Sequence, residues 1–157
     1  MKFNNLTRQQ DFIKDDINKS INRVLNHGKY ILGPEVMELE ESLSHFTGSK
    51  FCISTSSGTD ALLISLMAIN LKNGDEVITT PFTFVSTIEV IVLLGAKPIF
   101  VDIEEDTCNI NAEAIEAKIT SRTKAIIPVS LFGQTSDMDR INEIAKLNGN
   151  IAVIEDA

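Results

Sequence analysis

The sequence predicts an α/β protein with a mostly parallel sheet and helices on both faces. From residue 51 onward, short β-prone apolar runs alternate regularly with stretches of helical periodicity. These runs are almost continuously apolar, which is typical of strands that are buried on both faces. The chain has 157 residues, of which 43% are hydrophobic, so it can bury the core of one domain.

Two helices are expected before this alternation begins. Apolar residues at helical spacing predict an amphipathic helix over residues 7–26, with Thr7 and Gln10 as a capping box. Pro34 suits the first turn of a second helix, and Gly48 suits its end. Residues 1–33 are therefore interpreted as a helix-and-loop arm, which packs either against a partner subunit or as a surface helix of its own domain.

The alternating part of the chain contains five expected strands and four expected helices. The strands are Phe51–Thr55, Glu76–Thr80, Pro98–Ile103, Lys124–Val129 and Ile151–Ile154. The helices are Asp60–Leu71, Phe84–Leu94, Ala112–Ile119 and Asp137–Leu147. Strand–helix–strand units of this kind connect through right-handed crossovers.

Charge and composition exclude several classes of function. The net charge of -8 and the lack of any Lys/Arg cluster argue against nucleic-acid binding. The most apolar region, Val85–Ile103, is interrupted by charged residues, glycine and proline, so a membrane span is not expected. The first six residues, Met1–Leu6, are followed by polar and charged residues. This start does not resemble a signal peptide, and a cytoplasmic location is expected. Two separated cysteines and two separated histidines predict no metal site.

The turn Ser56–Thr59 is the most informative local feature. It joins the expected strand Phe51–Thr55 to an apolar helix, and a helix that begins on small polar residues presents free N–H groups to an anion. The turn lacks both the Gly-Lys-Ser/Thr of a P-loop and the G-x-G-x-x-G dinucleotide pattern. Two interpretations stay open from this turn alone: a phosphate site, or simply a well-capped helix.

Two further side chains follow strands and therefore belong to the same edge of the sheet as this turn. Phe84, in the segment Pro81–Phe84, is expected to stack on a flat ligand, with Phe82 packed in the interior. Asp156 follows a buried strand and can hold a protonated ring nitrogen, although an Asp there can also cap a following helix. A phosphate cup, a ring stacker and this carboxylate together fit pyridoxal 5'-phosphate.

These motifs are similar to those of the DegT/StrS-type sugar aminotransferases, which have the fold-type I architecture of aspartate aminotransferase. The matching segments are Gly28–Val36, Ser57–Leu62, Gly74–Thr79, Pro81–Phe84, Gly95–Pro98, Thr123–Ile126, Pro128–Gln134 and Val153–Ala157. The resemblance implies pyridoxal 5'-phosphate as cofactor and a cofactor site made of Ser57, Gly58, Thr59, Asp60, Phe84, Ser130 and Asp156.

The resemblance also implies the role of each residue. Gly58, Thr59 and Asp60 would contact the cofactor phosphate, Phe84 would stack on the pyridine ring, and Asp156 would bind its nitrogen. Ser130 stands where many relatives carry His, and the segment around it resembles members that act on UDP-linked 3-keto hexuronic acids.

The expected function is transfer of an amino group, with glutamate as donor, to a nucleotide-linked keto sugar for polysaccharide or glycan synthesis. Relatives are homodimers, and they carry a Schiff-base lysine after the segment that matches Val153–Ala157. The chain is therefore expected to be the N-terminal part, residues 1–157, of the large domain, without a catalytic residue and inactive alone. The alternatives are a sugar dehydratase of the same fold, in which His replaces that lysine, and a non-catalytic remnant or binding module.

Overall fold

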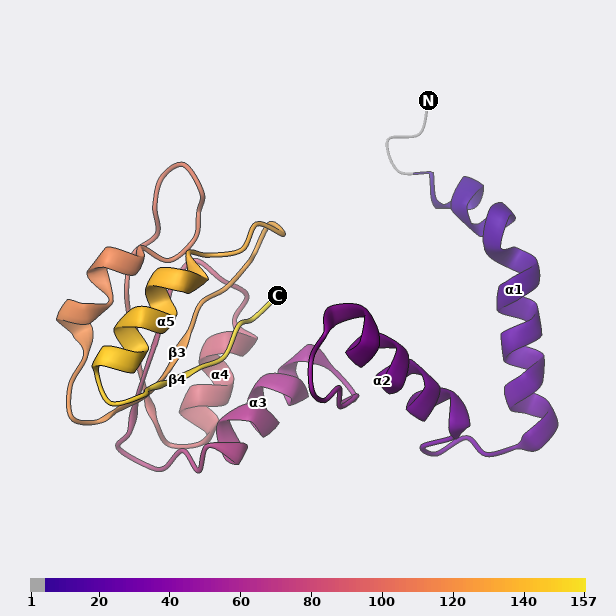
Figure 1. The fold of residues 1–157 in the computed structure, drawn as a ribbon, viewed down its shortest axis with the longest axis horizontal. Helices are drawn as coiled ribbons and strands as arrows, with labels where there is room; N and C mark the ends of the chain where they lie inside the picture. Colours follow the sequence, from indigo (N-terminus) through magenta and orange to yellow (C-terminus); the bar gives the residue numbers. More distant parts are fainter. Residues whose placement is uncertain (1–4) are drawn as a thin grey trace. The chain divides into compact units, whose positions relative to one another are not determined.

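The computed structural model describes residues 5–157 and divides the chain into two compact units, Met1–Ser54 and Thr55–Ala157 (Figure 1). The first unit includes the expected arm and also the helix that follows it. Residues 1–4, which entered the argument against a signal peptide, lie outside the described residues. Among residues 5–157, no helix combines the length and the apolar character needed to cross a membrane.

The first unit consists of two helices, α1 (Leu6–His27) and α2 (Pro34–Thr47), and both were predicted. Each ends at a glycine in the left-handed conformation, because a glycine has no Cβ to strain that backbone. The predicted capping box is wrong. Since α1 begins at Leu6, Thr7 lies within the first turn, and the N-cap residue Asn5 makes no side-chain cap bond.

A cluster of charged side chains connects the two helices. The Arg23 guanidinium Nε lies 3.1 Å from Glu35 Oε1, and a second ion pair joins Arg23 to Glu38. His27 Nε2 lies 3.0 Å from the same Glu35 oxygen, while its Nδ1 accepts a hydrogen bond from the Lys29 amide. The Nδ1 atom is therefore an acceptor, so the proton on this ring sits on Nε2 and is donated to Glu35.

The strand expected at Phe51–Thr55 does not form. This segment has no ladder partner among the described residues, and the Phe51 and Ile53 side chains are 73% and 79% exposed. The Ser54 amide instead donates to the carboxylate of Glu40 at 2.7 Å. A strand needs hydrogen-bonded neighbours, so β-propensity alone does not produce one.

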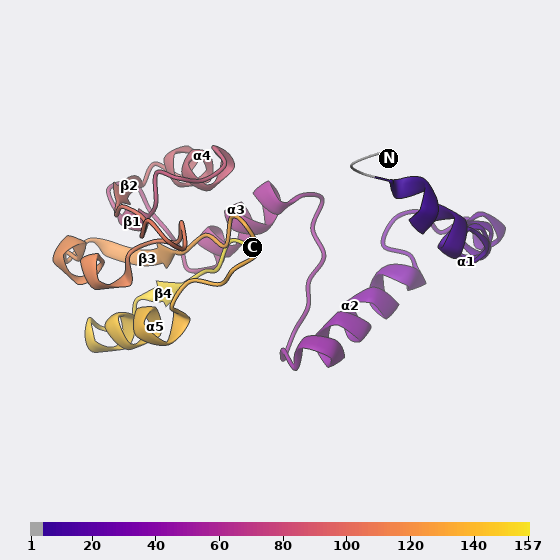
Figure 2. The ribbon, with the colours of Figure 1, turned by 90° about the horizontal axis from the view of Figure 1, so that it is seen from above.

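The second unit contains a four-stranded parallel sheet in the order β2-β1-β3-β4 (Figure 2). The strands are β1 (Glu76–Thr79), β2 (Lys97–Phe100), β3 (Thr123–Ile127) and β4 (Ala152–Val153). The helices are α3 (Gly58–Ala68), α4 (Ser86–Leu93) and α5 (Met138–Leu147). All of these elements were predicted, with ends that differ by a few residues.

The helix expected at Ala112–Ile119 is replaced by two 3-10 turns, Ala112–Ala114 and Glu116–Lys118. The amides of this segment donate hydrogen bonds to the carbonyl groups three residues earlier. An example is the 3.2 Å hydrogen bond from the Ile115 amide to the Ala112 carbonyl. Asn111 precedes the first of these turns, and its side chain makes no cap hydrogen bond. The side chains of Ala112 and Ile115 are buried against the sheet, and this burial holds the segment on the sheet although its backbone is irregular.

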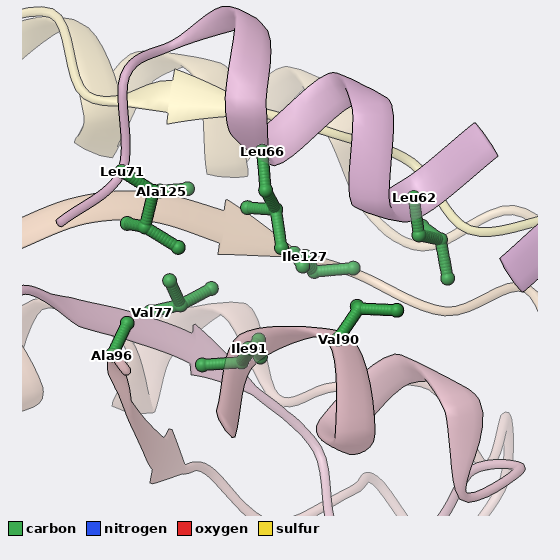
Figure 3. Packing of buried hydrophobic residues seen from close by; sticks show 9 residues of the cluster. All are labelled: Leu62, Leu66, Leu71, Val77, Val90, Ile91, Ala96, Ala125 and Ile127. Carbon is green, nitrogen blue, oxygen red and sulfur yellow. The ribbon is translucent and has the colours of Figure 1, made fainter. Parts of the chain in front are cut away.

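Buried side chains cover the sheet on both faces, as predicted. One cluster joins the sheet to α3 and α4 (Figure 3): Leu62, Leu66, Leu71, Val77, Val90, Ile91, Ala96, Ala125 and Ile127. The other joins it to the 3-10 turns and α5: Ile78, Val101, Ile110, Ala112, Ile115, Ile126, Ile141, Ile144 and Ala145. Neighbouring residues of one strand belong to opposite clusters because side chains alternate across a sheet.

The amino ends of the strands carry a buried carboxylate. Glu76 begins β1 with only 1% of its surface exposed. Its oxygens accept hydrogen bonds from the Thr120 hydroxyl at 2.5 Å and from Arg122 Nε at 3.0 Å. Lys124 is the second residue of β3, so it lies at this same edge of the sheet, opposite to the site described below.

Candidate cofactor site

A cleft of about 310 Å³ lies beyond the carboxyl ends of the strands in the second unit. Five of the seven residues predicted for the cofactor site line it: Gly58, Thr59, Phe84, Ser130 and Asp156. They come from the start of α3, the segment before α4, and the segments after β3 and β4 (Figure 2). Parallel strands bring these segments together because all of their carboxyl ends meet at one edge.

The start of α3 presents unoccupied amides to the cleft. The first helical hydrogen bond is donated by the Ala61 amide to the Ser57 carbonyl at 3.0 Å. Within residues 5–157 the amides of Gly58 and Thr59 have no hydrogen-bond acceptor. Both residues line the cleft, so the positive end of the helix is available to an anion there.

Ser57 and Asp60 lie beside this helix start, but neither belongs to the lining that the described residues form. Ser57 is the N-cap, and its Oγ accepts a hydrogen bond from the Asp60 amide at 3.1 Å. The Asp60 carboxylate accepts hydrogen bonds from the hydroxyls of Ser56 and Ser57, which hold the pKa of Asp60 below its usual range. These two residues therefore organise the turn, and the Asp60 amide is already occupied.

The two phenylalanines after β1 have different surroundings. Phe84 lines the cleft and is 69% exposed, so its ring is available to a flat ligand. Phe82 contacts Phe132, with ring centroids 6.2 Å apart, but it remains 43% exposed. The expectation that Phe82 is an interior residue is therefore wrong: it belongs to an aromatic pair near the surface.

Backbone pairing fixes the position of Asp156 and Ser130. The Asp156 amide donates to the Pro128 carbonyl at 2.9 Å, and the Ser130 amide donates to the Asp156 carbonyl at 2.8 Å. This bridge extends the pairing of β3 and β4 beyond the strands themselves. The Ser130 hydroxyl donates to Glu155 at 2.9 Å, and only 8% of Ser130 is exposed.

Sequence reasoning missed the hydroxyl that contacts the Asp156 carboxylate. Thr87 Oγ1 lies 2.6 Å from Asp156 Oδ2, and Thr83 Oγ1 lies 3.0 Å from Thr87 Oγ1. A polar residue on the buried face of the apolar helix α4 was the available signal. Thr83 lies three residues before α4 begins at Ser86, so a helical spacing rule does not predict its contact with Thr87.

The arrangement fits a flat, phosphorylated heterocycle such as pyridoxal 5'-phosphate. The free amides suit a phosphate, the Phe84 ring suits a planar face, and the Asp156 carboxylate suits a protonated ring nitrogen. The volume also lies at the small end of the range for ligand pockets, which begins at about 300 Å³. Among residues 5–157, no group of three His, Cys, Asp or Glu side chains is placed to hold a metal ion.

The DegT/DnrJ/EryC1/StrS aminotransferase family matches residues 11–157. A UDP-2-acetamido-2-deoxy-3-oxo-D-glucuronate aminotransferase from Pseudomonas aeruginosa is 57% identical over the whole chain, which spans 44% of that relative's length. The chain therefore corresponds to less than half of this curated relative.

Solved structures of similar fold include an aminotransferase of this family and a PLP-bound dehydratase. An aminotransferase of the DegT DnrJ EryC1 StrS type from Brucella abortus is 41% identical, with a TM-score of 0.93, over 99% of this chain and 43% of that one. An E. coli GDP-4-keto-6-deoxy-D-mannose-3-dehydratase with bound hydrated PLP is 32% identical, with a TM-score of 0.82, over 89% of this chain and 37% of that one. The fold is thus that of the fold-type I PLP-dependent transferases. By its match over residues 11–157, the chain belongs to the DegT/DnrJ/EryC1/StrS aminotransferase family.

Proposed function

We propose that this chain is the cofactor-binding part of a PLP-dependent nucleotide-sugar aminotransferase. The observation that carries the proposal is the convergence of two free helix amides, the Phe84 ring and the Asp156 carboxylate on one cleft. Each suits a different part of the same cofactor, so their joint presence is more specific than any one of them. The 57% identity to a UDP-sugar aminotransferase supports the same assignment.

In this proposal the amides of Gly58 and Thr59 bind the cofactor phosphate at the positive end of α3. Phe84 covers one face of the ring and excludes water from it. Asp156 accepts a hydrogen bond from the protonated ring nitrogen and so keeps the proton on that atom. When bound, the cofactor supplies an electron sink for the carbanion that transamination requires.

The proposed substrate is a UDP-linked 3-oxo hexuronic acid, with glutamate as the amino donor. The segment Val129–Gly133, which includes Ser130, resembles that of members acting on UDP-linked 3-keto hexuronic acids. This resemblance supports the choice, together with the substrate in the name of the Pseudomonas aeruginosa relative. The buried Ser130 hydroxyl contacts Glu155, so this residue helps to shape the cleft wall next to Asp156. We also propose that the parent protein is a cytoplasmic homodimer that supplies amino sugars for polysaccharide synthesis.

Cofactor titration tests the proposal. We expect pyridoxamine 5'-phosphate to bind the chain and to raise its melting temperature. Asp156→Ala should weaken this binding about tenfold or more, because a charge-assisted hydrogen bond is lost. The matched control is Asp139→Ala, which removes an exposed carboxylate from the first turn of α5 and should leave binding unchanged. Absence of binding by the unaltered chain would favour the non-catalytic remnant.

A product assay separates aminotransferase from dehydratase, the second class that a structural likeness supports. The cofactor-loaded protein is incubated with glutamate and a UDP-linked 3-oxo hexuronic acid. Transamination yields an amino sugar and 2-oxoglutarate, whereas dehydration yields a sugar lighter by one water. If neither product forms, the titration alone decides whether the chain binds the cofactor.

A further inference from the structure

The Asp156 carboxylate is held by a chain of two threonine hydroxyls. Thr87 Oγ1 lies 2.6 Å from Asp156 Oδ2, and Thr83 Oγ1 lies 3.0 Å from Thr87 Oγ1. Thr87 is completely buried at the start of α4, whereas Thr83 and Asp156 are half-buried. The contact joins residues that are 69 positions apart in the sequence, so only the fold brings it about.

The direction of this chain follows from the chemistry of its groups. A carboxylate has no hydrogen to give, so the Thr87 hydroxyl must be the donor to Asp156. A hydroxyl has a single hydrogen, and that of Thr87 is then already used. The Thr83 hydroxyl must therefore donate to Thr87. Two hydrogen bonds thus point along one line toward the carboxylate, and such chains strengthen each bond in them.

Asp156 is consequently restrained at both its main chain and its side chain. The main chain is paired with β3 through the bonds to Pro128 and from Ser130. In the side chain, Oδ2 is occupied by Thr87, while Oδ1 has no hydrogen-bond partner within the described part of the chain. One oxygen is therefore anchored, and the other has no hydrogen-bond partner among the described residues, on a residue that lines the cleft.

We propose that Thr87 is a positioning residue, which aims the free Oδ1 of Asp156 at the ring nitrogen of the cofactor, with Thr83 orienting its hydroxyl. This inference rests on the proposed function, since it names a supporting residue for the same site. Thr87 does not line the cleft formed by the described residues, so it acts through Asp156 rather than on the cofactor. A side chain that hydrogen-bonds to a ligand-binding group in this way fixes the orientation of that group.

A measurement without cofactor tests the contact itself. The carbon-13 signal of the Asp156 carboxyl group can be assigned by its loss in Asp156→Asn. We expect Thr87→Val to move this signal, because the hydroxyl donor is removed from a side chain of similar shape. Thr87→Ser should leave the signal near its original position, because the donor is retained. If the signal in Thr87→Val matches that of the unaltered chain, the inference is wrong.

Thr79→Val is the matched control. Thr79 is also fully buried, but its hydroxyl donates at 2.8 Å to the carbonyl of Ile127 rather than to Asp156. The control should therefore lower stability without moving the Asp156 signal. If Thr87→Val fails to fold, Thr83→Val serves in its place. Thr83 is half-buried, and loss of its hydroxyl should move the Asp156 signal by a smaller amount than loss of the Thr87 hydroxyl.

A double-mutant cycle tests the link to the cofactor. Thr87→Val should weaken the binding of pyridoxamine 5'-phosphate about tenfold, as the loss of one hydrogen bond to a charged group does. It should have no further effect in an Asp156→Ala background, since Thr87 acts only through that carboxylate. Binding of inorganic phosphate, which has no ring nitrogen, should be equal in the unaltered chain and in Thr87→Val.

The outcomes of these tests are distinguishable. Additive losses in the double mutant, or an equal loss of phosphate binding, would mean that Thr87 has a general structural role, and the inference would fail. If the unaltered chain does not bind pyridoxamine 5'-phosphate at all, the proposed function fails. The carbon-13 measurement then still decides whether Thr87 positions Asp156.

Discussion

Helices α1 and α5 carry similar sequence patterns but have opposite surroundings. Both have apolar residues at helical spacing on one face. In α5, Ile141 and Ile144 are 0% and 1% exposed, because that face packs on the sheet. In α1, Ile17 and Ile21 are 42% and 51% exposed, and no residue of the helix is buried by the described part of the chain. An amphipathic pattern thus predicts a helix, but burial requires a second layer.

The charged residues of the two units differ in the same way. In the first unit, Arg23 connects the helices through ion pairs with Glu35 and Glu38, and all of these side chains are partly exposed. In the second unit, Glu76 is buried and saturated by hydrogen bonds from Thr120 and Arg122. Exposed ion pairs are screened by water and salt, whereas a buried carboxylate depends on keeping its own partners.

The largest expected difference between the units comes from truncating an apolar side chain. Ile78→Ala removes a fully buried side chain from β1 and should lower the free energy of unfolding by about 2–5 kcal/mol. Ile21→Ala on α1 should change it by about 0.5 kcal/mol or less, because the side chain is half exposed and alanine favours helix. Urea unfolding measures both. Equal losses would show that α1 is buried to the same degree as β1.

A smaller effect is expected from acid. The hydrogen bond from Thr120, followed by that from Arg122, lowers the pKa of Glu76 in the folded chain. Its stabilisation is therefore complete above the unfolded pKa of about 4.3 and is lost as the pH falls through the lower folded value. Melting temperatures measured from pH 7 down to pH 2 should decline less steeply for Glu76→Gln. A slope identical to that of the unaltered chain would contradict this role.

The smallest effect is expected at the charged cluster of the first unit. Glu35→Gln removes the carboxylate that His27 and Arg23 share, so contact between α1 and α2 should weaken slightly at low salt. Amide hydrogen exchange near residues 28–33 measures this change. The difference from the unaltered chain should disappear in 1 M salt, where the screening length is about 3 Å. A difference that persists at high salt would mean that the contact is not mainly electrostatic.

Several elements could be predicted closely because their signals are local. The helix expected over residues 7–26 is observed as Leu6–His27, and the helix from Pro34 ends at Gly48 as expected. Proline and glycine act through their own backbone preferences, which do not depend on distant contacts. The parallel sheet was predictable for a similar reason, since each strand is a short apolar run between helical segments.

Other expectations failed because they needed information from distant residues. The run Phe51–Thr55 has the composition of a strand, but within the described residues no neighbour pairs with it. Residues Ala112–Ile119 have a helical pattern, but they form short 3-10 turns against the sheet. The composition of a segment indicates which secondary structure it favours, whereas strand pairing and packing decide which secondary structure it adopts.

The sequence by itself determined the family, the parallel α/β fold and the site residues that line the cleft, such as Gly58, Phe84 and Asp156. These depend on local motifs and on the rule that parallel strands end at one edge. Only the tertiary structure decided that Thr87 holds Asp156. A hydroxyl and a carboxylate 69 residues apart meet only after the sheet has formed, so no local pattern records their contact.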